Sequence, residues 1–167
     1  MSLQPPRIEL SFSGLKPGWI QARHLRRACW HSLHLAVQDE ALLERVEMIV
    51  EELAENLVKY SDWSHELKPA LMVRLDGGSQ QLSLITRNVA ATDGPHLERA
   101  LGVAEQLSIL PPAVAFKNRI EEAFGEEGLE ESRLGLLRIA FEGEADLQVK
   151  RETDDVLIIR ATLSLLE

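Results

Sequence analysis

The segment from Glu40 to Tyr60 constrains the fold of this chain more than any other. At 100° per residue its apolar residues fall on one side of a helix, and these are Leu42, Val46, Ile49, Leu53, Leu57 and Tyr60. Glutamates gather on the opposite side, where water solvates them. Asp39 stands where the N-cap of such a helix belongs. The pattern predicts a long helix with one buried side.

Glu52, Asn56 and Lys59 belong to neither side of this helix. They follow one another along the edge of the apolar stripe, with Glu52 and Asn56 one turn apart at i and i+4. A carboxylate, a carboxamide and an ammonium in such a row suit a Mg-bound phosphate. They also suit the solvated flank of an ordinary helix, which routinely exposes such residues. Spacing alone leaves both interpretations open.

Composition and charge narrow the class of protein. With 167 residues, 45% of them hydrophobic, the chain can bury one substantial core, so we expect a single domain spanning residues 1–167. A net charge of −9 argues against a nucleic-acid partner, because phosphate contacts need clustered Lys and Arg. No apolar run approaches the roughly 20 residues of a membrane span, and no signal-peptide pattern opens the chain. We therefore expect a cytoplasmic protein with no membrane partner.

The only cysteine, Cys29, cannot form an internal disulfide. It lies between Ala28 and Trp30 in a segment of helical spacing. We expect it to pack in the core rather than act as a nucleophile.

Periodicity and turn residues predict an order of elements along the chain. Strands are expected at 7–12, 70–75, 81–88, 147–151 and 156–165, and helices at 19–37, 40–60, 97–107, 111–124 and 134–141. The hairpins make the sheet mostly antiparallel, and the helices grouped between them suggest one covered face. We predict an α/β fold: a two-layer α/β sandwich with a mixed, mostly antiparallel sheet.

This order, with Glu52-x-x-x-Asn56-x-x-Lys59-Tyr60 on the long helix before the first hairpin, resembles the ATP-binding domain of the GHKL superfamily. That superfamily, which has the Bergerat-type ATP-binding fold, includes histidine-kinase-type ATPases. The resemblance is strongest to small bacterial regulatory kinases of the anti-sigma-factor and SiaB-like types, and it runs from about Leu42 to Leu165. It implies a bacterial signalling regulator with a small signalling protein as its partner.

The resemblance also implies a cofactor, Mg-ATP, and a reaction, the phosphorylation of Ser or Thr on the partner. By position, Glu52 takes the catalytic role of orienting or deprotonating the attacking group, and Asn56 takes the role of metal ligand. Carboxamide oxygen suits Mg²⁺ without adding negative charge beside a triphosphate. Lys59 would offset phosphate charge as a mobile cation.

Two glycine boxes of the family are altered in this chain. Where the family has Asp-x-Gly-x-Gly, the sequence reads Thr86-Arg87-Asn88-Val89-Ala90, so Asn88 is the candidate for the base-binding position. The nearby Asp93-Gly94 is either a displaced version of that box or an ordinary turn.

The second box reads Glu131-Ser132-Arg133-Leu134-Gly135. Ser132 is small and Gly135 is retained, so both stay candidates for binding the cofactor. Arg133 and Leu134 bring side chains where the family needs close backbone approach to phosphate. Nucleotide binding is therefore expected to be weak, atypical or lost.

The run Ser64-His65-Glu66-Leu67-Lys68-Pro69 resembles the phospho-acceptor box of histidine kinases. In those kinases the box lies on a separate helix before the ATP-binding domain, whereas here it follows the long helix directly. We interpret the match as a coincidence. His31 and His34 share a helix face but lack a third ligand for a metal.

Three readings of the function follow. In the first, the chain is a nucleotide-dependent regulator or Ser/Thr kinase, with residues 95–131 as a lid over the nucleotide. In the second, it is a degenerate relative that acts as a protein-interaction module without nucleotide. In the third, it is a homodimeric scaffold in which residues 1–37 form the dimer or partner surface. Trp19, Trp30 and Trp63 would then be interface anchors, although packing in the core is the alternative use of each.

Overall fold

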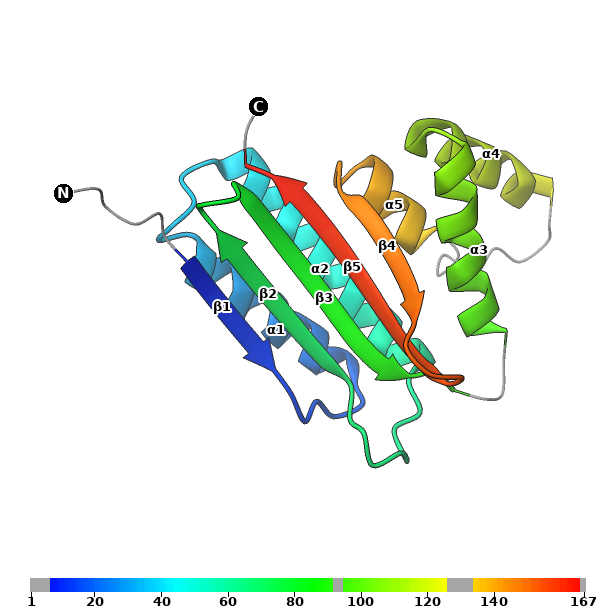
Figure 1. The fold of residues 1–167 in the computed structure, drawn as a ribbon, viewed down its shortest axis with the longest axis horizontal. Helices are drawn as coiled ribbons and strands as arrows, with labels where there is room; N and C mark the ends of the chain where they lie inside the picture. Colours follow the sequence, from blue (N-terminus) through cyan, green and yellow to red (C-terminus); the bar gives the residue numbers. More distant parts are fainter. Residues whose placement is uncertain (1–6, 92–94, 126–133, 166–167) are drawn as a thin grey trace.

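The structure is a computed structural model that describes residues 7–91, 95–125 and 134–165. Figure 1 shows one sheet with a layer of helices behind it and further helices at one edge. The elements follow one another as β1 (Arg7–Phe12), α1 (Trp19–Leu33), α2 (Glu40–Tyr60), β2 (Ala70–Asp76), β3 (Gln81–Val89), α3 (His96–Ile109), α4 (Pro112–Gly125), α5 (Gly135–Phe141), β4 (Asp146–Arg151) and β5 (Val156–Ser164).

The described strands form one sheet in the order β1-β2-β3-β5-β4. Each adjacent pair runs antiparallel, and Leu84 in the middle of β3 lies between Val73 of β2 and Ala161 of β5. The predicted two-layer α/β sandwich is confirmed, and its described strands are antiparallel throughout rather than mixed.

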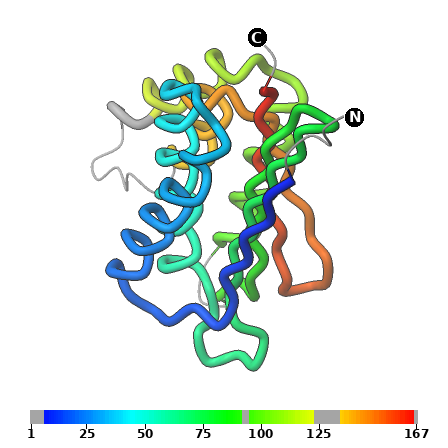
Figure 2. The backbone as a smooth tube through the Cα atoms, turned by 90° about the vertical axis from the view of Figure 1, so that its left-hand side faces the viewer, coloured from blue at the N-terminus to red at the C-terminus, as the bar shows by residue number. Residues whose placement is uncertain are grey.

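The helices cover one face of this sheet, as the edge-on view in Figure 2 shows for α1 and α2. Alternate strand residues point into the space between the layers, and the row on β3 begins with Leu82 and Leu84, which are fully buried. On α2 the predicted apolar stripe is buried in the same core cluster from Leu42 to Leu57, with Ile49 and Leu53 fully shielded from solvent, whereas Tyr60 at its end is only partly buried. Burial of this stripe contributes apolar contact between the two layers.

Helix α2 begins as the sequence predicts, because the Asp39 carboxylate accepts a hydrogen bond from the Leu42 backbone N–H at 3.1 Å. Helix α1, however, ends at Leu33 and not at Val37. The backbone N–H of Val37 still bonds to the Leu33 carbonyl, and the Val37 side chain is buried. The chain has to turn before Asp39, and the buried Val37 extends the apolar pattern past the end of the helix.

None of the helices in the described part of the chain has the length and apolar character needed to cross a membrane.

Cys29 lies in the core, 1% exposed, as expected from its place in the helical pattern. Burial raises the pKa of its thiol to about 12. Because the thiolate is the reactive form, a thiol reagent at pH 8 should not modify the native protein and should modify it fully in denaturant. Rapid labelling of the native protein would contradict this burial.

Candidate functional site

The inward row of β3 changes character toward the end of the strand. After Leu82 and Leu84 it continues with Thr86 and Asn88, which are 1% and 4% exposed. Their partners across the sheet on β5 are Ile159 and Leu157. Two polar side chains thus lie in an otherwise apolar layer, and buried polar groups need partners.

These residues form one wall of a cavity of about 490 Å³ between the sheet and the helices. Helix α2 supplies the second wall through its last two turns, α3 lies opposite, and α4 and α5 complete the lining. The volume falls within the range of small-molecule sites, which are mainly apolar with a few polar groups. The lining consists of Asn56, Leu57, Tyr60, Thr86, Asn88, Ala90, His96, Leu97, Arg99, Ala100, Gly102, Val103, Gln106, Arg119, Glu122, Leu136, Leu137, Leu157 and Ile159.

Asn56 is the residue of the predicted helix motif that reaches this cavity. Its amide nitrogen is buried and has no hydrogen-bond partner among the described residues. A buried amide left without a partner costs roughly 1–3 kcal/mol. The cavity is therefore the place where a bound ligand would recover that cost.

Asn88 lines the same cavity from the sheet. Its amide nitrogen donates to the Val89 carbonyl at 3.3 Å, and no described residue donates to its Oδ1. The oxygen is thus the atom left to accept a hydrogen bond from a ligand. The structure brings Asn56 and Asn88, two candidates 32 positions apart in sequence, to one cavity.

Glu52 lies beside the cavity but not in its lining. Its Oε1 accepts a hydrogen bond from Nη1 of Arg138, on α5, at 2.9 Å, and its side chain is 17% exposed. Burial raises the pKa of the Glu52 carboxyl, while the hydrogen bond and charge of Arg138 oppose that rise. The Arg138 guanidinium also donates through Nε to Glu142 at 2.6 Å. One arginine thus bridges two carboxylates.

Gly135, at the start of α5, makes this pairing sterically feasible. A Cβ added at Gly135 would lie 2.6 Å from Oε2 of Glu52 and 4.0 Å from Oδ1 of Asn56. Absence of a side chain therefore lets α5 approach α2 directly over these two residues. The fold thus brings together Glu52, Asn56 and Gly135. Their proximity allows α5 to pack on α2 and the Glu52–Arg138 ion pair to form.

Lys59 is directed elsewhere. Its ammonium pairs with Glu55 at 3.0 Å and lies 5.3 Å from the ring centroid of Trp19, on α1. It is not part of the cavity lining. Ser132, the remaining candidate, lies outside the described residues, as does Asp93.

A bound Mg²⁺ would find few protein ligands here. The described residues contain no group of three or more His, Cys, Asp or Glu side chains able to hold a metal. Asn56 Oδ1 fits the role of a single oxygen ligand, and Mg²⁺ commonly takes only one or two protein ligands while phosphate and water supply the rest. The donor set therefore fits a nucleotide-bound Mg²⁺ and not a free ion.

Several polar residues of the cavity are not singled out by the sequence, and Arg99, Gln106 and Arg119 are among them. Arg99, Gly102 and Gln106 follow the spacing i, i+3 and i+7, which places them on one face of a helix. That spacing was visible in the sequence. The structure shows in addition that this face of α3 borders the cavity.

Comparison with known proteins shows the fold. The chain resembles one in the crystal structure of the SiaB–SiaC complex from Pseudomonas aeruginosa, with a TM-score of 0.63 and 19% sequence identity. The match covers 92% of this chain and 89% of that one. No protein-family model matches the sequence, and a search of curated proteins found no match. The likeness therefore places the chain among proteins of this α/β sandwich architecture.

Gly135→Ala tests the contact between α2 and α5, and Gly102→Ala, on α3 and away from that contact, is the reference substitution. Gly102→Ala adds a methyl group with no other atom within 4 Å, so it should stabilise α3 by about 0.5–1 kcal/mol. Gly135→Ala should gain less or destabilise, because the new methyl group displaces the Glu52 carboxylate from Arg138.

In a Glu52→Ala background this obstacle is gone, so Gly135→Ala should become more favourable there. Urea denaturation of the four combinations of Glu52→Ala and Gly135→Ala measures the coupling. An identical effect of Gly135→Ala in both backgrounds would refute the contact.

Proposed function

We propose that this protein is a bacterial signalling regulator that binds a Mg-adenine nucleotide weakly in the cavity between α2, α3 and the sheet, and that acts on a small partner protein. The observation that carries the proposal is the position of Asn56 and Asn88. Both border one cavity of about 490 Å³, and Asn56 has a buried amide nitrogen without a partner in the described chain. The sequence resemblance assigns nucleotide contacts to both positions.

The chemistry of the lining supports a purine ligand. Leu57, Leu157 and Ile159 offer apolar surface for a flat ring. Asn88 presents an oxygen acceptor from a position 4% exposed, which suits an exocyclic amino group. Buried acceptors of this kind discriminate strongly against ligands that leave them unpaired.

A bound Mg²⁺ would supply charge neutralisation at the phosphates. Asn56 is the residue of this chain that would hold it, and Glu52 is the residue that would orient or deprotonate a Ser or Thr hydroxyl of the partner protein. In the structure Glu52 is engaged by Arg138, so phosphoryl transfer requires that this ion pair opens.

The same ion pair favours a second candidate function. A carboxylate held by Arg138 and partly buried against α5 serves as a structural tether between helices. The protein would then bind its partner, and bind nucleotide or not, without any phosphoryl transfer. In support of a protein partner, the similar chain belongs to a crystal structure of a two-protein complex.

Calorimetric titration tests nucleotide binding. The wild type should bind Mg-ATP, and Asn56→Ala should weaken that binding about tenfold or more, because a hydrogen bond to a charged group contributes roughly 1.5–3 kcal/mol. Asn118→Ala, the same chemical change on α4 outside the cavity lining, is the matched control and should leave affinity unchanged.

Two outcomes count against the proposal. Absence of binding at millimolar Mg-ATP would leave only the interaction module. Equal loss in the Asn56 and Asn118 variants would place the nucleotide outside this cavity. Once binding is established, ATP turnover in the wild type and in Glu52→Gln separates the kinase from the non-catalytic regulator.

A further inference from the structure

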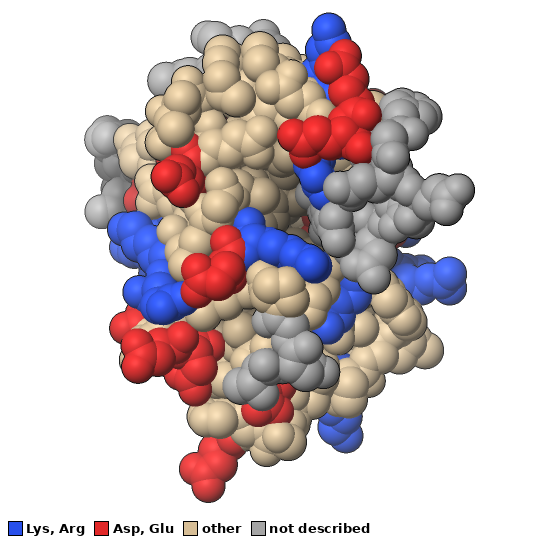
Figure 3. All heavy atoms as spheres, turned by 90° about the vertical axis from the view of Figure 1, so that its right-hand side faces the viewer, with Lys and Arg blue, Asp and Glu red and all other residues tan. Residues whose placement is uncertain are grey.

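The described lining of the cavity carries more positive than negative charge, although the chain as a whole has a net charge of −9. Among the described residues that line it, the charged side chains are Arg99, Arg119 and one carboxylate, Glu122. Figure 3 views the face on the side of α3 and α4, where basic side chains border a hollow. An acidic protein that gathers arginines at one cavity presents a local site for an anion.

Arg119, on α4, is the better shielded of the two, with a side chain 19% exposed. Its Nη1 donates to Glu122 at 2.7 Å, and Glu122 itself is 59% exposed. An ion pair with so exposed a carboxylate holds the arginine weakly. Since a guanidinium has five N–H donors in a rigid fork, Arg119 keeps donors for a second acceptor.

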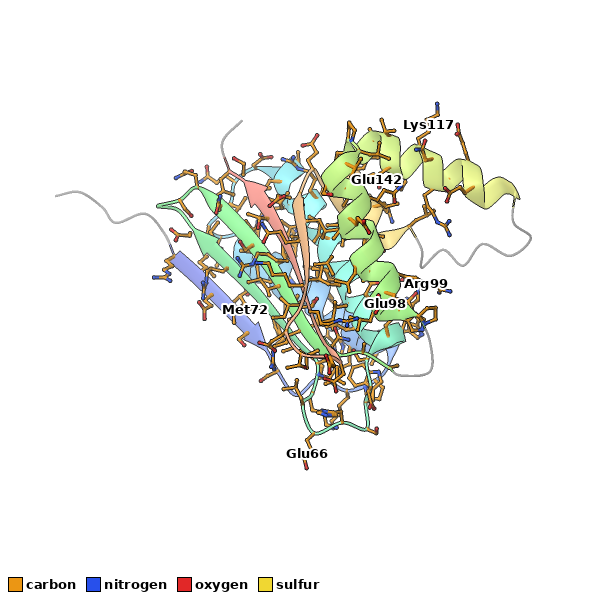
Figure 4. The ribbon with its side chains drawn as sticks, turned by 45° about the vertical axis from the view of Figure 1, so that its right-hand side comes forward. Glu66, Met72, Glu98, Arg99, Lys117 and Glu142 are labelled. Carbon is orange, nitrogen blue, oxygen red and sulfur yellow. The ribbon has the colours of Figure 1, made fainter. Side chains whose placement is uncertain are left out.

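Arg99 lies on the face of α3 that borders the cavity. Gly102, one turn further along, leaves an indentation, since an added Cβ there meets no atom within 4 Å. Gln106 follows on the same face, so two polar side chains flank the gap. No described carboxylate pairs with Arg99, whereas its neighbour Glu98 pairs with Arg151 of β4. Figure 4 shows Glu98 and Arg99 on the early turns of α3.

We propose that Arg99 and Arg119 hold the phosphates of the bound nucleotide, so that arginine side chains on α3 and α4 replace the backbone cradle of a glycine-rich loop. This inference rests on the proposed function, because it needs a nucleotide in the cavity. The sequence from Glu131 to Leu137 retains one glycine, Gly135, and that glycine is packed against Glu52. Phosphate recognition therefore needs donors from elsewhere, and bidentate arginine supplies them.

The consequence is a preference for phosphorylated ligands that depends on two side chains. Arg119→Gln and Arg99→Gln should each weaken Mg-ATP binding about tenfold and leave adenosine affinity unchanged. The double variant should lose most of the preference for Mg-ATP over adenosine and keep only the part that Asn56 contributes through Mg²⁺. Lys117→Gln is the matched control, since Lys117 is on the same helix as Arg119 but is 73% exposed and points away from the body of the protein, as Figure 4 shows.

Calorimetry with adenosine, Mg-ADP and Mg-ATP distinguishes failure of the proposed function from failure of the phosphate assignment. If the wild type binds neither adenosine nor nucleotide, the proposed function itself fails. If the wild type prefers Mg-ATP and the arginine variants keep that preference, the assignment of phosphate to Arg99 and Arg119 is overturned while nucleotide binding stands.

A second measurement guards against unfolded variants. In the wild type, added salt should weaken Mg-ATP binding and leave adenosine binding nearly unchanged, because salt screens the contacts between arginine and phosphate. Equal salt dependence for the two ligands would overturn the inference without any substitution.

Discussion

Burial of the apolar stripe of α2 against the sheet is the interaction on which the rest of the structure depends. Ile49 and Leu53 of α2 belong to the same core cluster as Leu82 and Leu84 in the inward row of β3, and all four are fully buried. Shielding side chains of this size contributes roughly 1.5–3 kcal/mol each. The packing fixes how α2 is rotated about its axis, and that rotation directs Asn56 to the cavity and leaves Glu52 facing α5. The site is thus a by-product of how the core is packed.

The cavity lies where the inward row of β3 changes from apolar to polar residues. Thr86 and Asn88 continue the row of Leu82 and Leu84 on the same face of β3, and α2 opposes them with Asn56. Instead of closing this gap, α3 lies across it and contributes arginine and glutamine. Glu52, one turn earlier on α2, is taken up by Arg138. The pocket and the ion pair therefore divide the predicted motif between two tasks: Asn56 belongs to the cavity, and Glu52 to the contact between helices.

Much of the fold could be predicted from the sequence, because periodicity reports which residues are buried. The alternation of Leu82 and Leu84 and the helical spacing from Leu42 to Tyr60 are local signals, and the structure confirms the elements they predict. Asn56 was also placed at the core boundary by spacing alone. Local spacing could not reveal that Glu52 would meet Arg138, which is 86 positions away, or that Lys59 would reach the ring of Trp19 on α1. The partners of such long charged side chains are brought close by the tertiary fold, and local sequence periodicity does not encode them.

The proposed function requires that the space between α2, α3 and the sheet receives a nucleotide. A crystal structure of the protein grown with Mg²⁺ and a non-hydrolysable ATP analogue tests it most directly. Difference density for the purine should lie against Asn88 and Leu157, with Asn56 directed at the metal or phosphates. Density on another face of the molecule, or a cavity collapsed by inward movement of Leu97 and Val103 with no ligand in it, would contradict the claim.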